Sequence, residues 1–375
     1  MSETVPTNRA PRILILGEAA AIHTRRWVAW FRHRGWVVRW LSFPPVAGGA
    51  DAEIIPRRHR WRAMGIVLNV SHVRRIIDEF KPDVLSALFL PDYGWLAALT
   101  KRHPLAVSAW GSDVLIAPAK SRLHRWRIES VLRSADLVFA DAELLRDRME
   151  GLGADPGRIH IIPLGVDPAW VDIGESRSVR ANPPTRIVST RRLEPLYQVD
   201  VLLRAVSRLS KSTDRSFQLV VVGDGSQRAA LESLSHELGV SGIVAFAGAV
   251  SDDAMRMHLS QADLYVSCSV SDGTSVSLLE AMATGCLPIV TDLPANREWI
   301  THETNGLLFP VGDDSSLADA LRRSIGDLSL REQSRRRNTA IIRERALWPE
   351  NMSRAESLLL SLTGFGERLG PRENP

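Results

Sequence analysis

Cysteines and long apolar runs are both scarce in this chain of 375 residues. Its two cysteines, Cys268 and Cys286, are too few for a disulfide framework and lack the spacing of a metal site, so we expect a reducing compartment. No segment approaches the roughly eighteen uninterrupted apolar residues of a membrane-spanning helix, and the apolar stretch 13–16 is too short for a signal peptide. We therefore expect a cytoplasmic protein that at most lies on the inner face of the cell membrane.

Carboxylates in the Asp-x-Asp pattern are absent as well. Because hard metal ions are held in proteins mainly by grouped carboxylate oxygens, we expect no metal, and we expect no other cofactor. The sequence also has no fixed-period repeat and no low-complexity tract, which excludes solenoid and fibrous architectures.

Positive charge is concentrated in the first half of the chain. The net charge is +4, but residues 1–165 hold 24 Lys and Arg against 16 Asp and Glu, and they include eight of the eleven tryptophans. The densest basic run, called the basic segment below, consists of Arg57, Arg58, His59, Arg60, Trp61 and Arg62. Such a run suits anionic lipid, nucleic acid or a phosphorylated substrate, or it is a solvated loop beside core aromatics. We expect contact with an anionic membrane and no nucleic-acid partner.

Strands and helices alternate in both halves, which is typical of parallel sheets covered by helices on both faces. We therefore predict an α/β protein with two Rossmann-like, doubly wound domains, an N-terminal one over residues 1–168 and a C-terminal one over 169–347. An amphipathic closing segment, 348–375, is expected to return to the first domain. The predicted strands are 12–16, 36–41, 83–88, 106–109, 136–140, 159–163, 186–190, 218–222, 243–246, 264–267, 287–291 and 306–309.

Between residues 163 and 184 the periodicity gives way to Pro, Gly, Asp and Ser, so we place the interdomain hinge there. Ligands of open α/β sheets bind outside the carboxyl ends of the strands. Two such domains joined by a hinge are therefore expected to bind their ligand in a central cleft.

The most informative stretch is residues 271–285, with the sequence SDGTSVSLLEAMATG. It predicts a loop, a Thr or Ser cap and a short helix that ends at Gly285. The free amide groups and the dipole at such a helix start favour an anion or sugar hydroxyls. Asp272 precedes the helix and Glu280 lies about two turns later, so the two carboxylates would reach different parts of one elongated ligand. The alternative is a capped helix with a solvated glutamate.

With other residues of the chain, this stretch resembles glycosyltransferase family 4, whose members are retaining enzymes of the GT-B fold. Asp272 and Glu280 match the family's acidic pair, which is usually two glutamates separated by seven residues. The other matching residues are Gly165, Val166, Asp167, Gly223, Asp224, Gly225, Ala281, Met282, Ala283, Gly285, Pro288, Asn305, Gly306 and Leu307.

The resemblance implies transfer of a hexosyl-type sugar from a nucleotide-diphosphate sugar to a glycan, a lipid-linked acceptor or a small molecule. It implies that Glu280 binds the donor ribose and that Asp272, with nearby amide groups, holds the sugar and the leaving diphosphate. Arg192 matches the family's diphosphate-binding arginine, a role that suits the forked guanidinium. Further donor-binding candidates are Gly17, His23, Arg191, Tyr197, Gly223, Gly225, Gly248, Gly273, Thr274, Ser275 and Val276.

Two family positions are filled differently here. The lysine that usually follows the arginine is replaced by Tyr197, although Arg191, or His23 and Arg26, could supply charge. The histidine near the reacting sugar is replaced by Trp110, which leaves Asp113 as the natural catalytic substitute. Core packing for Trp110, and a helix-capping or core position for His23, are the structural alternatives.

Two other functions remain open, and the sequence argues against a third. A binding protein for nucleotide sugars or lipids that has lost catalysis would explain Tyr197 and Trp110. A nucleotide-sugar 2-epimerase would share the two domains but not the pattern from Asp272 to Glu280. A glycogen-type phosphorylase needs a lysine for pyridoxal phosphate, and Lys211, in a polar segment, is the only lysine after Lys120.

Overall fold

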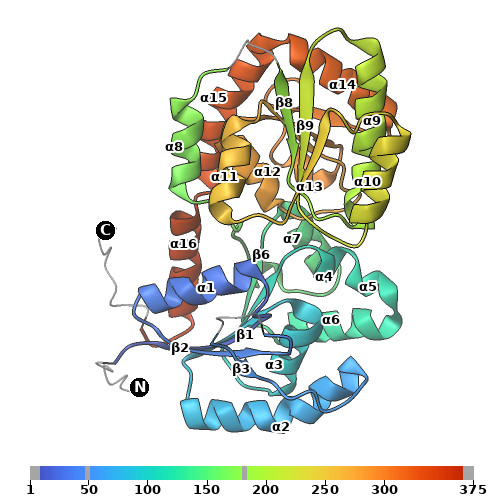
Figure 1. Ribbon diagram of the computed structural model, residues 1–375. Coiled ribbons are helices and arrows are strands. Elements are labelled where there is room, and N and C mark those ends of the chain that lie inside the picture. The colour runs from blue at the N-terminus through green and yellow to red at the C-terminus, as the bar shows by residue number, and fades with distance from the viewer. Residues whose placement is uncertain (1–8, 47–50, 180–183, 366–375) are drawn as a thin grey trace. The chain divides into compact units, whose positions relative to one another are not determined.

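The computed structural model describes residues 9–46, 51–179 and 184–365, which divide into two compact units (Figure 1). The first unit consists of the described residues of 1–163 together with those from Glu350 onward, and the second is 164–349. The boundaries therefore fall at 163 and 349, beside the values of 168 and 347 expected from the sequence. Each unit contains one parallel sheet with helices on both faces, which confirms the predicted pair of Rossmann-like domains.

The first unit has a seven-stranded sheet in the order β3-β2-β1-β4-β5-β6-β7. Its elements are β1 (Arg12–Leu16), α1 (Ile22–His33), β2 (Val37–Ser42), β3 (Glu53–Ile54), α2 (Arg62–Phe80), β4 (Val84–Leu88), the π-helix η1 (Leu90–Gly94), α3 (Trp95–Leu99), β5 (Leu105–Ala109), α4 (Ser112–Leu115), α5 (Ala117–Lys120), α6 (Arg122–Ser134), β6 (Leu137–Ala140), α7 (Glu143–Glu150), the 3-10 helix η2 (Pro156–Arg158) and β7 (Ile159–Ile161). The central strands are buried on both faces, so they are nearly continuous apolar runs.

Helices cover both faces of this sheet. On one face α2, α3 and α6 bury their apolar sides in a single cluster with the strands. On the other face α1 contributes Trp27, whose ring lies edge-on to Phe139 with 5.7 Å between centroids. The closing helix α16 (Trp348–Ser361) contributes Glu356 to the first unit, where its carboxylate accepts hydrogen bonds from the Trp36 indole at 2.8 Å and the Arg34 guanidinium at 2.9 Å.

The second unit has a six-stranded sheet in the order β10-β9-β8-β11-β12-β13. Its elements are α8 (Pro168–Ser176), β8 (Thr185–Ser189), the 3-10 helix η3 (Pro195–Tyr197), α9 (Val199–Ser212), β9 (Phe217–Val222), α10 (Arg228–Glu237), β10 (Val244–Gly248), α11 (Asp252–Gln261), β11 (Leu264–Ser267), α12 (Val276–Ala283), β12 (Leu287–Thr291), α13 (Pro294–Arg297), β13 (Leu307–Phe309), α14 (Asp314–Gly326) and α15 (Leu328–Arg345). One core cluster joins the sheet to α9, α10 and α14, and another joins it to α8, α11, α12 and α15 (Figure 1).

The expected irregular hinge over 163–184 is wrong for Pro168–Ser176, which forms α8. Asp167 caps this helix by accepting a hydrogen bond from the Ala169 amide at 3.0 Å, and proline at the first helical position is compatible with a helix start. Trp170 is buried. The Pro, Asp and Gly residues here are therefore helix-start and close-packing residues; residues 180–183 lie outside the described part.

No helix in the described part of the chain combines the length and the apolar character that crossing a membrane requires.

Candidate functional site

Three loops of the second unit meet at the carboxyl ends of β8, β9 and β11. In the sheet, β8 lies between β9 and β11. The strands that follow β8 in sequence are therefore added first on one side of it, as β9 and β10, and then on the other, as β11, β12 and β13. Such a reversal is where open α/β sheets bind ligands, because the two connections leave in opposite directions. Backbone hydrogen bonds fix the loops to one another, among them Val270 N to Leu196 O at 3.0 Å and Leu193 N to Asp224 O at 3.1 Å.

The loop after β11 leads into α12 as the sequence predicts. Ser275 is the N-cap, and its hydroxyl accepts a hydrogen bond from the Leu278 amide at 3.3 Å. The helix ends before Gly285, which has φ +76°, a left-handed conformation that favours glycine. The start of α12 is therefore a capped helix N-terminus at the carboxyl edge of the sheet, suited to an anion.

Arg191 brings a buried positive charge to this helix start. Its guanidinium donates to the Asp272 carboxylate at 2.6 Å and also to the Ser275 hydroxyl. The Tyr197 ring covers it, with 4.4 Å between the arginine Cζ and the ring centroid. Its Nε has no hydrogen-bond partner among the described residues. Tyr197 therefore helps to hold the Arg191 guanidinium in place, and its match to the family's lysine position stays a prediction.

The protonation of Asp272 is set by two opposing effects. Burial raises the pKa of the Asp272 carboxyl, while the charge and hydrogen bond of Arg191 lower it, and burial dominates. The side chain is still 20% exposed, whereas that of Arg191 is 8% exposed. A ligand that reaches this edge would thus meet the carboxylate first, with the guanidinium behind it.

The glycine turn after β9 positions the Arg191 loop. A Cβ atom at Gly223 would lie 2.4 Å from the Arg191 carbonyl oxygen, and one at Gly225 would lie 2.4 Å from the Leu193 carbonyl oxygen. Gly248, with φ +73°, accepts a hydrogen bond from the Gly223 amide at 2.8 Å. In this structure Gly223 and Gly225 allow close packing of backbone in the Arg191 loop, and Gly248 has a left-handed conformation that favours glycine. Contact between the three glycines and a donor stays a prediction.

Arg192 points to solvent. Its side chain is 74% exposed and lies 3.8 Å from the Glu194 carboxylate. The structure thus brings Arg191, and not Arg192, to the start of α12. Binding of a diphosphate by Arg192 stays a prediction, and it requires the side chain to leave Glu194.

The remaining candidates of this unit lie in or beside α12. Gly273 and Thr274 are buried in the loop, and the Thr274 hydroxyl accepts a hydrogen bond from the Trp299 indole at 3.4 Å. Val276 begins the helix, and Glu280 lies about one turn after it, partly exposed, whereas Asp272 lies in the loop before the N-cap. Binding of one elongated ligand by this acidic pair stays a prediction.

Two first-unit candidates lie at the carboxyl end of β1. Gly17 is buried, and a Cβ there would lie 2.9 Å from Thr24 Cγ2, so this glycine permits close packing. His23 lies edge-on to Trp110, with 5.8 Å between centroids, and its Nδ1 has no hydrogen-bond partner among the described residues. Burial, helped by the charge of Arg26, lowers the pKa of His23 to about 4, so the ring is neutral at pH 7.

Asp113, the expected substitute for the family histidine, is completely buried. Its carboxylate accepts backbone hydrogen bonds from Trp110 at 3.1 Å and from Leu90 at 3.4 Å. Burial raises the pKa of Asp113 to about 6 despite these bonds. The structure gives this group a structural role in holding two loops together; proton transfer by Asp113 stays a prediction.

Sequence reasoning missed how these residues are held together. The Ser277 hydroxyl donates to the Thr190 carbonyl oxygen at 3.3 Å, which ties α12 to the end of β8. An aromatic residue six positions after an arginine gave no signal that the two side chains stack. Among the described residues, no group of three or more His, Cys, Asp or Glu side chains has the arrangement of a metal site.

Comparison with known protein families assigns both units. The model for "Glycosyl transferases group 1" matches residues 175–340, and the model for "Glycosyl transferase 4-like" matches residues 12–142. The first match contains every candidate of the second unit, and the second contains Gly17, His23 and Asp113.

Curated relatives are glycosyltransferases. The chain is 26% identical over 294 residues to the uncharacterized glycosyltransferase MJ1607 of Methanocaldococcus jannaschii, covering 76% of this chain and 69% of that one. It is 28% identical to the lipopolysaccharide core biosynthesis glycosyltransferase LpsE of Rhizobium meliloti (70% and 71% covered). It is 30% identical to the D-inositol 3-phosphate glycosyltransferase of Nocardia farcinica (53% and 47% covered). The matched region spans about half to seven-tenths of these relatives' lengths.

Solved structures share the fold over nearly the whole chain. Anabaena Alr3699/HepE in complex with UDP superposes with a TM-score of 0.78 at 18% identity, covering 94% of this chain and 100% of that one. Sucrose-phosphate synthase from Thermosynechococcus elongatus gives 0.75 at 17% identity, covering 94% and 99%. With both family matches and the two parallel-sheet units, these likenesses establish that the chain belongs to the family 4-like glycosyltransferases of the GT-B fold.

Proposed function

We propose that this glycosyltransferase uses a nucleotide-diphosphate sugar as donor and transfers a hexosyl-type sugar with retention of configuration. The observation that carries the proposal is the buried guanidinium of Arg191 at the capped start of α12, beside Asp272. A diphosphate needs positive charge and free amide donors, and this edge of the sheet offers both. The binding of UDP by the similarly folded Anabaena protein supports the choice of donor.

In the proposed site the diphosphate lies against the first turn of α12. The amide groups of Gly273 to Ser275 and the Arg191 guanidinium donate to it, Asp272 accepts from sugar hydroxyls, and Glu280 accepts from the ribose. Arg192 would add a second guanidinium once it leaves Glu194. These donors would act most strongly as charge develops on the leaving diphosphate, which is how fixed dipoles lower a barrier.

Retention is proposed to follow from departure of the diphosphate and attack of the acceptor on the same face of the sugar, through an oxocarbenium-like transition state. Neither a metal nor a cofactor is required in this scheme, because the guanidinium and the helix amides stabilise the leaving group. Full activity in the presence of a chelator is the expected result.

The acceptor is proposed to be a glycan, a lipid-linked glycan or a small molecule. The Rhizobium relative supports the first two classes, because its name assigns that protein to lipopolysaccharide core biosynthesis. For a lipid-linked acceptor, the protein would work on the cytoplasmic side of the membrane, and we propose that the basic segment makes contact there.

The donor is tested by thermal unfolding of the purified protein with UDP, GDP, ADP and their hexose derivatives. A ligand that binds the native state at a hundred times its Kd raises the free energy of unfolding by about 2.7 kcal/mol, so its base and sugar are identified by the shift. Product anomers are then assigned by NMR. Failure of every nucleotide to raise the melting temperature would overturn the donor assignment.

Two other outcomes distinguish the competing functions. Nucleotide binding without hydrolysis or transfer would support a relative that has lost catalysis. Release of free 2-epimerised sugar without an acceptor would support an epimerase.

A further inference from the structure

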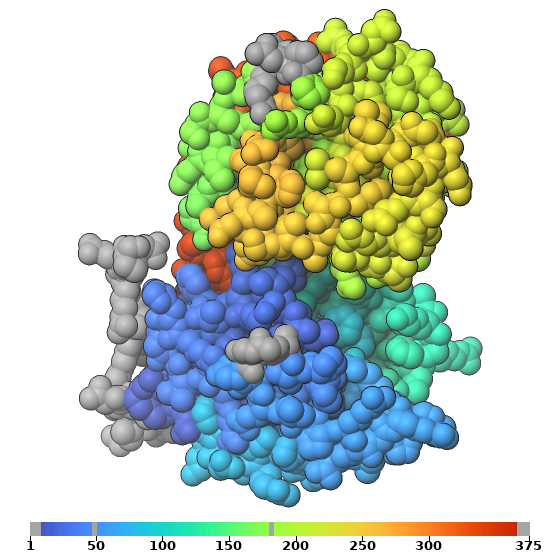
Figure 2. Space-filling model, viewed as in Figure 1, coloured from blue at the N-terminus to red at the C-terminus, as the bar shows by residue number. Residues whose placement is uncertain are grey.

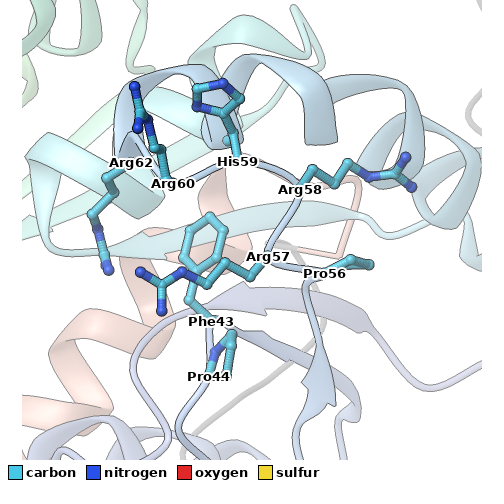
Figure 3. Close-up of a pocket in the computed structure, with 9 residues that line it drawn as sticks. Phe43, Pro44, Pro56, Arg57, Arg58, His59, Arg60 and Arg62 are labelled. Carbon is cyan, nitrogen blue, oxygen red and sulfur yellow. The ribbon is translucent and has the colours of Figure 1, made fainter.

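A pocket of about 170 Å³ lies at the basic segment of the first unit. One side is formed by Phe43 and Pro44, which follow β2, and the other by Pro56 and the segment that leads into α2 (Figure 3). The Arg62 guanidinium lies over the Phe43 ring, with 5.2 Å between Cζ and the ring centroid, and in Figure 3 Arg58 extends away from that ring. The described lining residues carry no carboxylate, so the pocket is positively charged with apolar walls.

Of the four arginines that line the pocket, two have side-chain hydrogen bonds to other residues, and the other two have none within the described part of the chain. Arg58 donates to the Asn69 side chain at 3.0 Å, and Arg62 pairs with Asp92 at 2.7 Å. Arg57 has no hydrogen bond or ion pair to any residue that the structure describes, and Arg60 contacts the Trp61 ring at 5.3 Å. Exposed guanidinium groups without carboxylate partners are what an anion needs.

The charge extends beyond the pocket along α2. Between Glu53 and Asp78 the sequence has six arginines and no carboxylate, because Arg74 and Arg75 of α2 add to the four of the basic segment. All six arginine side chains are exposed. The segment and helix therefore present charge of one sign over about two dozen residues.

Large apolar side chains are exposed on the same helix. The exposed fractions are 62% for Trp61, 44% for Met64, 47% for Val67 and 43% for Leu68. At 100° per residue the last three lie on one side of the helix, opposite the core-facing Ile66, Val73 and Ile77. Trp61 is the N-cap residue, with an extended backbone, just before the helix. In Figure 2, α2 (light blue) forms part of the surface of the first unit. An outward apolar stripe bordered by arginines is the arrangement of an interfacial membrane helix.

We propose that the outward side of α2 and the basic segment form a docking surface for an anionic phospholipid bilayer, with the pocket receiving a lipid phosphate. Trp61, Met64, Val67 and Leu68 would enter the boundary between headgroups and acyl chains, and Arg57 and Arg60 would bind phosphate. The inference rests on the part of the proposed function that brings the protein to a membrane, and it does not depend on sugar transfer.

The bilayer explains features that other occupants do not. A soluble phosphorylated ligand would use the pocket but not the four apolar side chains beside it. A second copy of this chain would bring six more arginines to the same surface, and their repulsion opposes pairing. Each arginine near an anionic membrane contributes about 1 kcal/mol, so charge complementarity favours the bilayer.

The experiment measures binding of the intact protein to vesicles of phosphatidylglycerol and phosphatidylcholine, and to vesicles of phosphatidylcholine alone, without donor or acceptor. Three double variants are compared: Arg57→Gln with Arg60→Gln, Trp61→Ser with Leu68→Ser, and Arg148→Gln with Arg337→Gln. The last is a matched control, because the side chains of Arg148 and Arg337 are also exposed and have no hydrogen bond or ion pair within the described ranges. Melting temperatures with and without the nucleotide sugar show that all variants remain folded and bind donor.

We expect binding to the anionic vesicles only, weakened by salt at about 0.5 M. Loss of Arg57 and Arg60 should lower the partition coefficient about thirtyfold, which corresponds to about 1 kcal/mol for each charge. Loss of Trp61 and Leu68 should lower it more than tenfold, and the control should change it less than twofold.

Four results would overturn the inference. The first is equal binding to neutral and anionic vesicles, or none. The second is an equal loss in the control, which would show that net charge alone is responsible. The third is calorimetric binding of inorganic phosphate that requires Arg57 and Arg60 without vesicle binding, which would assign the pocket to a soluble ligand. A dimer that dissociates in the Trp61 variant would instead assign the surface to a second copy. None of these outcomes bears on whether the protein transfers sugar.

Discussion

Arg191 and Asp272 form an ion pair at the start of α12, with 2.6 Å between Nη2 and Oδ2. The guanidinium also donates to the N-cap Ser275, so one side chain joins the acidic loop, the helix cap and the end of β8. A guanidinium carries five N–H donors, and its Nε here is buried without a partner among the described residues, so Arg191 has donor capacity beyond Asp272 and Ser275. The pair is therefore both a structural link and the proposed positive charge of the donor site.

Replacing Arg191 tests both roles. Arg191→Met leaves Asp272 with no cation at its oxygen, and we expect kcat/KM to fall more than tenfold, which is at least about 1.4 kcal/mol of transition-state stabilisation. The free energy of unfolding should fall by about 3 kcal/mol, because a largely buried carboxylate loses its partner. Urea unfolding and initial rates measure the two effects. Arg191→Met/Asp272→Leu should recover stability but not rate; recovery of both would remove Arg191 from the donor site.

Arg192 lies in the neighbouring position and has a different environment. Because its side chain is exposed and weakly paired with Glu194, Arg192→Ala should leave the melting temperature unchanged. Because Arg192 is predicted to contact the diphosphate, the same variant should lower the rate of transfer more than tenfold. An unchanged rate would leave Arg191 as the sole arginine candidate of the β8 loop.

Glu280 is tested by separating donor binding from stability. Glu280→Ala should abolish detectable transfer and raise the Kd for the nucleotide at least tenfold, because a charge-assisted hydrogen bond to ribose is worth about 1.5–3 kcal/mol. Glu280→Gln keeps one acceptor oxygen and should lose less. Calorimetric titration with the nucleotide alone measures this effect, and a wild-type Kd in both variants would exclude contact with ribose.

The buried Asp113 predicts a dependence of stability on pH. Its native pKa of about 6 lies above the ordinary value of about 4, so the native state holds the proton more tightly than the unfolded chain. The free energy of unfolding contributed by this group is therefore highest below pH 4 and falls as the pH rises through 6, by on the order of 3 kcal/mol. Asp113→Asn carries no such proton. The free energy of unfolding of the variant minus that of the wild type, measured with urea, should thus increase from pH 4 to 7. A constant difference would contradict the assignment.

The strands were predictable because their signal is local. The runs at 12–16, 264–267 and 287–291 coincide with β1, β11 and β12, since a strand buried on both faces must be almost wholly apolar. The two-residue strand β3 has no such signal. It exists only because Glu53 and Ile54 pair with the end of β2, which is a tertiary contact.

The helix of the candidate site was predictable from the sequence, but the arginine that reaches its start was not. The cap at Ser275 and the helix end before Gly285 follow from local propensity, and both are confirmed. Which of two adjacent arginines is buried depends on the direction of the loop, which the sequence does not encode locally. Here the close approach of Gly223 and Gly225 to the backbone of residues 191–193 fixes that direction. The same limitation hid α8, because Pro and Asp are typical both of loops and of the first residues of a helix.

The contact of Glu356 with Trp36 has a consequence for biosynthesis. After the ribosome has made the last strand of the first sheet, it has to add almost two hundred residues before it reaches Glu356. Only then is the carboxylate present that accepts the hydrogen bond of the Trp36 indole. The second unit is continuous in sequence and can therefore be packed as it emerges. The first unit is thus synthesised first but completed last. A nascent chain interrupted after residue 349 would contain all residues of the second unit but would lack the closing part of the first.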